Sequence, residues 1–399
     1  MNESETPNGP RFASALSTEA DTSEAIGQAF RRAGEELGTR PDLAMVFVSP
    51  HHTGALEGLA ADACDRLGTE TLIGSTGESI VGRGREVEDG PAVSLWLASL
   101  PGATVLPMHL HLRQTPEGGT IVGWPDDLPP VWPEGTALLV LGEPFSFPAD
   151  FLLERLNEDR PGLPVIGGMA SSGTQPGENR LLLGRRIIEQ GAVAVMIHGP
   201  VRVRTVVSQG CRPIGQHYVV TKSQRNIIEQ LGGKPSMVRL QEVYRTLPTR
   251  EQELVQQGLH VGRVVDEYQD RFEQGDFLVR NVIGADPDNG SIAVGDTIRP
   301  GQTVQFHIRD QHTAHDDLHR MLAAVRSAPG ASTGGALLFT CNGRGRRLFS
   351  QADHDALAVQ EALGDIPLAG FFAQGELGPV GGKNFVHGFT ASIALFGSA

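Results

Sequence analysis

Residues 335–345 read GALLFTCNGRG and residues 366–380 read IPLAGFFAQGELGPV, with room for about one helix between them. Each segment starts with an apolar run typical of a buried strand and ends in a polar turn that contains glycine. The pattern therefore predicts strand, helix and strand, with polar side chains at both strand ends, which is good material for a small-ligand pocket. The predicted ligand-binding residues of this stretch are Cys341, Asn342, Arg344, Gln374, Gly375 and Glu376.

The same pattern occurs twice more, at residues 43–74 and 137–167, in segments of similar length to residues 336–370. In each, a second apolar strand ends in a glycine turn and a return strand follows; in the last repeat we expect it at residues 385–396. We interpret this as an internal repeat of about 55–60 residues, typical of stacked supersecondary units. The predicted fold class is α/β, with mixed β-sheets covered by helices, built from repeated strand-helix-strand-turn-strand units in two domains.

Different material separates the second and third repeats and sets the predicted domain boundary. Residues 277–310 alternate in polarity and contain turn signals, which predicts a β-hairpin or meander. We therefore expect one domain at residues 11–220 and a second at 221–399, after a disordered tail at 1–10. Residues 114–135 are rich in Pro, Gly and Asp and include two tryptophans. They are expected to form a long excursion over the surface.

The composition limits the classes of partner. The formal net charge is −14, which disfavours binding to nucleic acid or to an anionic membrane. The apolar runs are far shorter than the roughly 20 residues that a membrane span needs, and the polar N-terminus does not resemble a signal peptide. The three cysteines, Cys64, Cys211 and Cys341, are far apart in the sequence and form no Cys-x-x-Cys motif. This usage is typical of a cytoplasmic protein without disulfides.

Arg344 and Glu376 would give the predicted pocket opposite charges. Arg344 can hold a carboxylate through two parallel hydrogen bonds, and Glu376 can accept hydrogen bonds from an ammonium group. Such a site suits a zwitterion such as an amino acid. The first repeat carries a matching Gly77-Glu78 pair, so its strand end is predicted as a second pocket wall, formed by Gly74, Ser75 and Glu78. A tight turn with a surface arginine, and a solvated polar loop, remain the alternative interpretations of these segments.

Nucleotide and metal sites are less well supported by the residues. Residues 74–78 lack the Gly-Lys-Ser/Thr ending of a phosphate-binding P-loop. His315 and His319 have the i, i+4 spacing of a metal pair but no Glu in the position of a His-Glu-x-x-His motif. We therefore expect no metal and no cofactor.

A catalytic cysteine is the enzymatic alternative. Cys341 lies at a strand end near Arg344, which could lower the pKa of its thiol, but a base would still be needed. The local candidates for that base are His354 and His387. A cysteine-dependent enzyme acting on a small amide or thioester, and a ligand-free protein-interaction scaffold, stay as alternatives to a binding protein that is not an enzyme.

These motifs resemble those of the FIST family. The C-terminal GALLFTCNGRG and PLAGFFAQGELGPVGGKNFVHGFTASI resemble the FIST C domain, and FASALS, LIGSTGESIVG and LPVIGGMASSG resemble the FIST N domain. The resemblance covers residues 11–396 and implies a sensory, small-ligand-binding protein of intracellular signal transduction. It places the polar strand-end positions of the family on Cys341, Asn342, Arg344 and Glu376. Family members often carry output modules, and this sequence shows none, so the resemblance implies a signalling protein partner or ligand sequestration.

Overall fold

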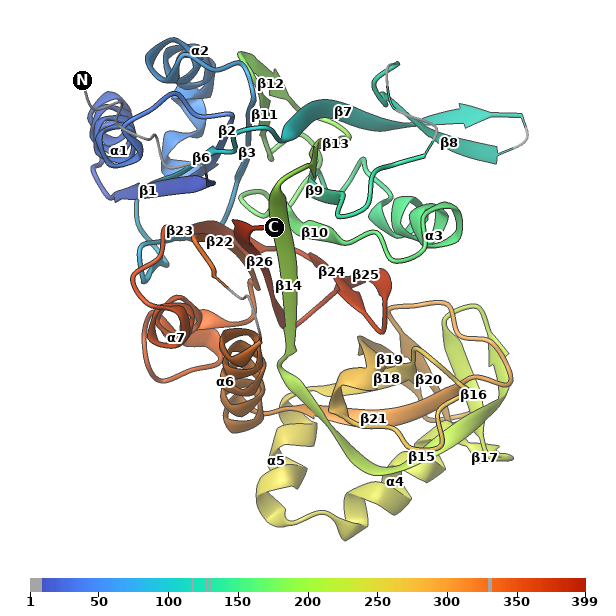
Figure 1. Cartoon of the computed structure of the whole chain (residues 1–399). Coiled ribbons are helices and arrows are strands. Elements are labelled where there is room, and N and C mark those ends of the chain that lie inside the picture. The colour runs from blue at the N-terminus through green and yellow to red at the C-terminus, as the bar shows by residue number, and fades with distance from the viewer. Residues whose placement is uncertain (1–8, 117, 127, 129–130, 329–331) are drawn as a thin grey trace, which may run out of the picture. The chain divides into compact units, whose positions relative to one another are not determined.

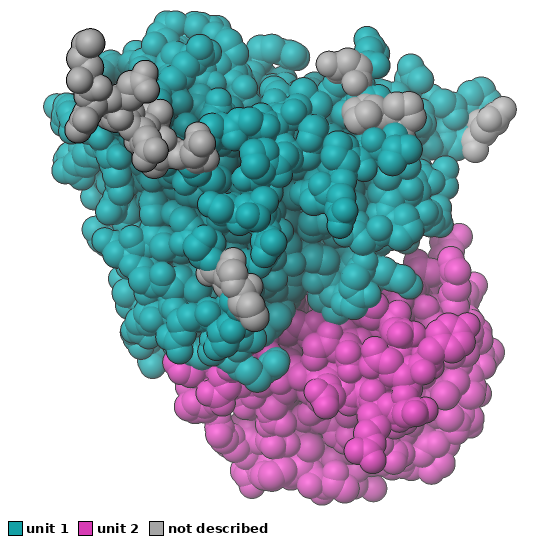
Figure 2. All heavy atoms as spheres, in the orientation of Figure 1, with its two compact units in different colours: residues 1–207, 319–386, 390–399 teal, residues 208–318, 387–389 magenta. Residues whose placement is uncertain are grey.

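The computed structural model describes residues 9–116, 118–126, 128, 131–328 and 332–399, which form two compact units (Figures 1 and 2). Unit 1 holds the described residues of 1–207, 319–386 and 390–399, and unit 2 holds 208–318 and 387–389. Unit 2 is therefore an insertion, in sequence, within unit 1. Among the described residues, no helix is both long and apolar enough to cross a membrane.

Unit 1 contains three β-sheets with the same order of equivalent strands. The strands of the first sheet are, in order across it, β1 (Arg11–Ser17), β6 (Val93–Ser99), β2 (Leu43–Val48), β3 (Leu72–Thr76), β11 (Leu181–Leu183) and β12 (Arg186–Ile188). Those of the second are β8 (Gly118–Val122), β7 (Thr104–Thr115), β13 (Ala192–His198), β9 (Ala137–Gly142), β10 (Val165–Met169), β24 (Glu376–Val380) and β25 (Lys383–His387). Those of the third are β14 (Val201–Gln209), β26 (Thr390–Ser398), β22 (Gly335–Cys341), β23 (Leu368–Ala373), β4 (Ile80–Gly82) and β5 (Arg85–Val87).

The predicted repeat is visible in the strand pairing. In each sheet two strands run parallel, β2 with β3, β9 with β10, and β22 with β23. The connecting helices are α2 (Leu56–Leu67), α3 (Ala149–Asp159) and α7 (His354–Leu363). The return strands β6, β13 and β26 then pair antiparallel with the first strand of their repeat. The predicted α/β class with mixed sheets is therefore confirmed.

The repeats exchange their hairpins. Hairpin β4–β5 of the first repeat pairs with β23 of the third, β11–β12 of the second pairs with β3 of the first, and β24–β25 of the third pairs with β10 of the second. The exchange forms a closed cycle, so each sheet needs a strand from another repeat to be complete. It brings residues far apart in the sequence to the same strand ends.

Strand β2 shows why the strands of unit 1 are continuously apolar. Its residues 43, 45 and 47 face a core shared with the other two sheets. Its residues 44, 46 and 48 pack under α2 and α1 (Thr22–Leu37). A strand covered on both faces has no solvent side, so the alternation of polar and apolar residues disappears.

A glycine occupies the same register position in the second strand of every repeat: Gly74, Gly167 and Gly370. A Cβ atom there would lie 2.4, 1.8 and 1.8 Å, respectively, from a carbonyl oxygen of the parallel neighbouring strand. These approaches are too close for any side chain. The repeated glycine is therefore explained by strand packing.

Unit 2 is a barrel of antiparallel strands. Around the ring the strands are β15 (Cys211–Gln224), β21 (Thr303–Arg309), β18 (Leu259–Val264), β19 (Phe277–Asp286), β20 (Ser291–Val294) and β16 (Ile227–Leu231). β16 also pairs with β15, which closes the ring. The remaining elements are β17 (Lys234–Pro235), α4 (Ser236–Thr246) and α5 (Thr249–Gln257). The hairpin β19–β20 lies where a hairpin or meander was predicted, and β21 pairs with β15 and β18 instead of with β20. Helix α6 (Gln311–Ser327) follows the barrel and leads to β22.

Two local predictions need correction. The expected surface excursion at residues 114–135 begins with a hairpin, because β7 continues to Thr115 and pairs with β8. The expected single return strand at residues 385–396 is two strands, β25 and β26, interrupted at Gly388 and Phe389. Of the predicted disordered tail at residues 1–10, residues 1–8 lie outside the described residues. The domain boundary predicted near residue 220 stays a prediction.

Candidate functional site

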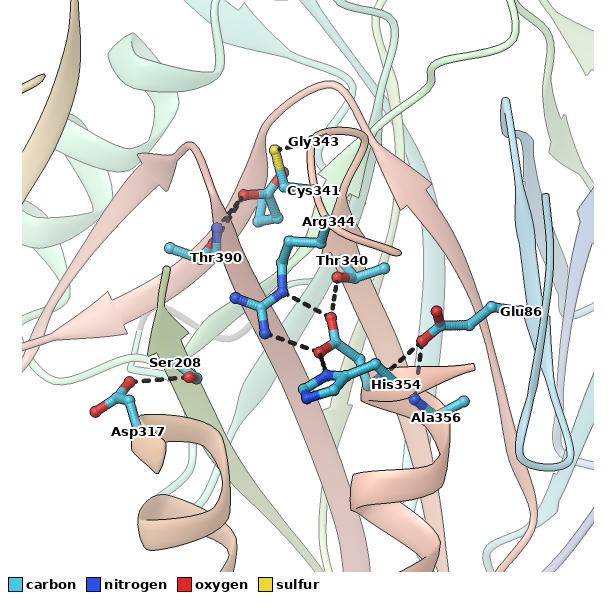
Figure 3. Close-up of polar contacts among 12 residues, drawn as sticks. Glu86, Ser208, Asp317, Thr340, Cys341, Gly343, Arg344, His354, Ala356 and Thr390 are labelled. Carbon is cyan, nitrogen blue, oxygen red and sulfur yellow. Dashed lines mark hydrogen bonds and ion pairs between the residues drawn. The ribbon is translucent and has the colours of Figure 1, made fainter. Parts of the chain in front are cut away.

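The end of strand β22 and the turn after it carry a buried polar cluster (Figure 3). The cluster lies within unit 1, and the hairpin exchange supplies part of it. Strand β24 contributes Glu376, and strand β5 of the first repeat contributes Glu86. Both carboxyl groups are buried, in a region that apolar strands surround.

Arg344 is completely buried and is held by Asp355 in the first turn of α7. Its Nε and Nη2 donate to the two carboxylate oxygens of Asp355 at 2.7 and 2.8 Å. Thr340 Oγ1 donates to the same carboxylate at 2.6 Å. Burial alone would raise the pKa of Asp355, but the Arg344 guanidinium outweighs it and holds that pKa well below its usual range. The pair is therefore an ionised, hydrogen-bonded structural centre.

The Arg344 side chain also contacts an aromatic pair. Its guanidinium carbon lies 5.2 Å from the centroid of the Phe349 ring, and the His354 ring stacks on the Phe349 ring with the two centroids 3.4 Å apart. His354 Nδ1 lies 2.8 Å from Asp355 Oδ1. These contacts fix the guanidinium in position.

Glu86 accepts hydrogen bonds at the start of α7. Its Oε1 accepts from the backbone N–H groups of Asp355 and Ala356, both at 2.9 Å. Carboxyl groups are favourable at a helix N-terminus, where backbone N–H groups lack helical partners. Burial and the neighbouring Asp355 charge raise the pKa of Glu86 to about 8.

Glu376 is also completely buried. Its Oε2 accepts from Thr390 N at 3.1 Å and from Thr390 Oγ1 at 2.8 Å. Its Oε1 has no nitrogen or oxygen donor among the described residues. Burial raises the pKa of Glu376 to about 8, although Thr390, Arg344 and the Cys341 thiol all act to lower it. Glu376, Arg344 and Cys341 are therefore electrostatic neighbours in the structure.

The repeats make the position of Glu376 unusual. Register pairing places Glu376 opposite Gly168, one residue after the repeated glycine Gly167. The equivalent hairpin positions in the other two sheets are Leu181 and Ile80, both fully buried. An ionisable side chain thus replaces a leucine or isoleucine at a site that the fold makes apolar. Burying a carboxyl group there costs free energy, which indicates a role other than packing.

Asn342 and Cys341 continue the cluster toward the surface. Asn342 N donates to Ala373 O at 3.0 Å, but Asn342 Oδ1 is buried without a hydrogen-bond partner among the described residues. Cys341 is half-buried, and its sulfur accepts from Gly343 N at 3.4 Å. Arg347 joins the first repeat to this turn, because its Nη1 donates to Asn342 O at 3.0 Å and its guanidinium forms an ion pair with Glu78.

The remaining predicted residues are placed less directly. Gln374 is exposed, and Gly375 accepts a backbone hydrogen bond from Met169. Gly74 and Ser75 are buried inside β3, where they pair with β11. The structure thus brings Cys341, Asn342, Arg344 and Glu376 together. Glu78 is connected to them through its ion pair with Arg347. Gly74 and Ser75 have their described contacts within the first sheet.

Sequence reasoning missed Glu86, Thr340, Asp355 and Thr390, which all belong to the cluster. The sequence contains one indication of the role of Asp355, because it is an acidic residue among apolar ones in the helix-like segment after Arg344. It contains none for Glu86 or Thr390. As to metal binding, the described part of the chain contains no group of three or more His, Cys, Asp or Glu side chains placed to hold an ion.

Comparison with known proteins agrees with the motifs. The FIST N domain matches residues 42–234 and the FIST C domain matches residues 240–379. An uncharacterized protein of Mycobacterium tuberculosis (strain CDC 1551 / Oshkosh) is 45% identical over 390 residues, covering 97% of this chain and 99% of its own length. An uncharacterized protein of Mycobacterium bovis (strain ATCC BAA-935 / AF2122/97) is 41% identical over 390 residues, covering 97% and 98%. FIST domains are associated with sensory, ligand-binding signalling rather than with catalysis. This chain belongs to the FIST family.

Proposed function

We propose that this chain is a cytoplasmic sensory protein that binds a small polar ligand with an amine or ammonium group, such as an amino acid. The observation that supports the proposal is that two buried oxygens, Asn342 Oδ1 and Glu376 Oε1, have no nitrogen or oxygen donor among the described residues. Glu86 Oε2 also lacks a partner among them, and the Cys341 thiol hydrogen-bonds to the Glu376 carboxyl group. Buried polar atoms in proteins are nearly always hydrogen-bonded. Glu376 Oε1 belongs to β24, and Asn342 Oδ1 belongs to the turn after β22. Strands β22 and β24 contact each other. A ligand that donates N–H groups would satisfy both oxygens.

Glu376 is the group of the cluster proposed to receive the ammonium group, because the Arg344 guanidinium is already paired with Asp355. The two Arg344 nitrogens predicted to hold a ligand carboxylate are bonded to Asp355 in the structure. Arg344 is therefore proposed to fix the cluster, while Asn342 and the exposed Gln374 offer polar groups to the rest of the ligand. Gly375, Glu78 and the strand end at Gly74 and Ser75 complete the proposed walls. A neutral Glu376 would lose its proton when an ammonium group binds, because an adjacent opposite charge favours the ionised carboxylate.

The proposed output is a change in interaction with a signalling partner, since the ligand site lies where strands from all three repeats meet. Strand β10 of the second repeat pairs with β24, and the turn at Glu78 of the first repeat is tied to Arg347. Ligand binding at these strand ends would alter contacts between repeats.

Calorimetry on a panel of amino acids and their deaminated analogues tests this proposal. We expect every hit to carry an amine and the deaminated partner to fail. Asn342→Ala should weaken a hit by roughly tenfold, and Glu376→Gln by roughly 10- to 150-fold, as expected for loss of a charge-assisted hydrogen bond. Glu361→Gln, the same change on the exposed face of α7, is the matched control.

The assignment of the amine site to Glu376 would be contradicted by a compound that binds Glu376→Gln and Glu361→Gln with equal affinity. Mass spectrometry should be run on the same hits. A stable adduct on Cys341 would point to the cysteine-dependent enzyme instead.

A further inference from the structure

Strand β8 and helix α3 of the second repeat, both labelled in Figure 1, supply much of the lining of a hollow in unit 1. Its volume is about 440 Å³, within the range of about 300–1,000 Å³ found for small-molecule sites. None of the residues of the polar cluster around Glu376 lines it. The two tryptophans that the sequence placed in a surface excursion, Trp124 and Trp132, form part of its wall.

The two tryptophan rings form a tilted aromatic pair in the wall of the hollow. Their centroids lie 5.9 Å apart with an angle of 52° between the planes. Both side chains are half-buried and pack on the core beneath α3. The floor is apolar and is made by Ile121, Leu152 and Leu156. Aromatic walls over an aliphatic floor favour a planar aromatic guest.

The rim of the hollow carries more positive than negative charge, although the whole chain is acidic. Arg155 and Arg160 line it, against one carboxylate, Asp159. The Arg160 guanidinium carbon lies 5.3 Å from the centroid of the Trp132 ring, which places that charge beside the aromatic wall. Arg155 is paired with Glu158 at 3.1 Å, but both side chains are well exposed, so this ion pair costs little to break.

We propose that this hollow binds a planar aromatic anion, with the ring against Trp124 and Trp132 and the acidic group at Arg155 and Arg160. The tryptophans supply stacking and the guanidinium groups supply charge-assisted hydrogen bonds. This second site is independent of the proposed amine site at Glu376. It gives the second repeat a binding role of its own.

The test uses 2-naphthoate as the probe and 2-naphthamide, which has the same ring and no charge, as its matched control. Binding is measured by calorimetry and by tryptophan fluorescence. The chain has three tryptophans, and Trp96 is fully buried in the core, so Trp124 and Trp132 dominate any change in emission. A ligand of this size is expected to bind with a Kd of about 1 mM or tighter. The amide should bind at least severalfold more weakly.

Variants then locate the site. Trp132→Ala should weaken 2-naphthoate roughly five- to tenfold, and Trp132→Phe, which keeps a ring, should lose less. Arg160→Gln and Arg155→Gln should weaken 2-naphthoate and leave 2-naphthamide unchanged. Glu376→Gln should bind both probes as the wild type does. Thermal unfolding shows which variants are folded. If Trp132→Ala does not fold, Arg155→Gln still tests the site, because Arg155 is exposed and its substitution should not affect folding.

Three outcomes overturn the inference. The first is no binding of 2-naphthoate to the wild-type protein at millimolar concentration. The second is equal affinity for the acid and the amide, which removes the anion from the proposal. The third is an affinity that Trp132→Ala and Arg155→Gln leave intact or that Glu376→Gln reduces, since the probe would then occupy another site.

Discussion

Arg344 and Asp355 form a bidentate ion pair in which neither side chain is exposed to solvent. The pair joins the turn after β22 to the first turn of α7, and Glu86 caps the same turn of the helix from another repeat. Breaking one buried partner leaves the other charge uncompensated, which is more costly than losing both. This pair therefore holds the turn after β22 and the start of α7 in place beside the proposed ligand site.

Asp355→Asn should destabilise unit 1 by about 3–5 kcal/mol, because it leaves the Arg344 guanidinium buried without its counter-charge. Urea unfolding measures the change. The control is Asp89→Asn, which removes an exposed partner of Arg346 and should cost about 1 kcal/mol or less. Equal effects of the two substitutions would show that the buried pair is not a stabilising centre.

Raising the pH should destabilise unit 1 through Glu376 and Glu86. Both have a pKa of about 8 in the folded protein, above the value of 4.5 of an unperturbed glutamate. Their neutral forms are favoured in the fold, so this contribution is complete below pH 4.5 and is lost as the pH rises through 8. Each group can contribute up to about 1.4 kcal/mol per pH unit. Hydrogen exchange of unit 1 peptides between pH 6.5 and 8 measures the loss.

The matched variants for this pH dependence are Glu376→Gln and Glu361→Gln. The first keeps an acceptor for Thr390 but cannot ionise, so its stability should fall less steeply with pH. The second removes an exposed carboxylate from α7 and should keep the wild-type slope. A slope that Glu376→Gln does not reduce would mean that Glu376 is ionised in the folded protein.

The repeat could be predicted from the sequence because its cause is local. A strand buried on both faces must be continuously apolar, and a glycine is required in the second strand of each repeat, where a carbonyl of the parallel first strand lies too close for a Cβ atom. The return strand at residues 385–396 was only partly predictable. Its apolar pattern runs through Gly388 and Phe389, and nothing local announces the break.

The partners of the site residues could not be predicted, because the hairpin exchange decides them. The sequence predicted one pocket for Arg344 and Glu376, and the Arg344 guanidinium does act on the pKa of the Glu376 carboxyl group. The sequence could not show that Asp355 accepts the hydrogen bonds of the Arg344 guanidinium. It also could not show that Glu86, in the first repeat, accepts hydrogen bonds from the first turn of α7. Non-local register, rather than residue type, sets those contacts. The matched FIST N and FIST C regions likewise both supply strands to unit 1, through the pairs β10–β24 and β4–β23.

Gly370→Ala should destabilise unit 1 by about 1–3 kcal/mol or more, because its Cβ would lie 1.8 Å from Leu338 O and the strands would have to separate. Chemical denaturation measures the effect. Gly34→Ala, in the interior of α1, is the opposite control. Its Cβ would meet nothing within 4 Å, so it should stabilise the helix by about 0.5–1 kcal/mol. A Gly370→Ala protein as stable as the wild type would show that the close approach is not obligatory.

Unit 2 should respond to pH in the opposite direction from unit 1. His260 and His307 lie opposite each other on β18 and β21, and both are buried. Burial lowers the pKa of each to about 4, with Arg309 adding to the effect on His260 and His260 adding to that on His307. The unfolded chain therefore binds protons first as the pH falls below 6.5, and stability is lost progressively toward pH 4.

Hydrogen exchange of barrel peptides between pH 7 and pH 5 should detect this loss, which can reach about 1.4 kcal/mol per pH unit for each histidine. His307→Gln cannot be protonated in this range, so its barrel should show a shallower pH dependence even if it is less stable overall. His312→Gln, an exposed histidine of unit 2, should keep the wild-type dependence. Because the comparison is between slopes and not stabilities, a general weakening of the barrel cannot imitate the result. Parallel slopes for the three proteins would refute the assignment of the acid response to the buried pair.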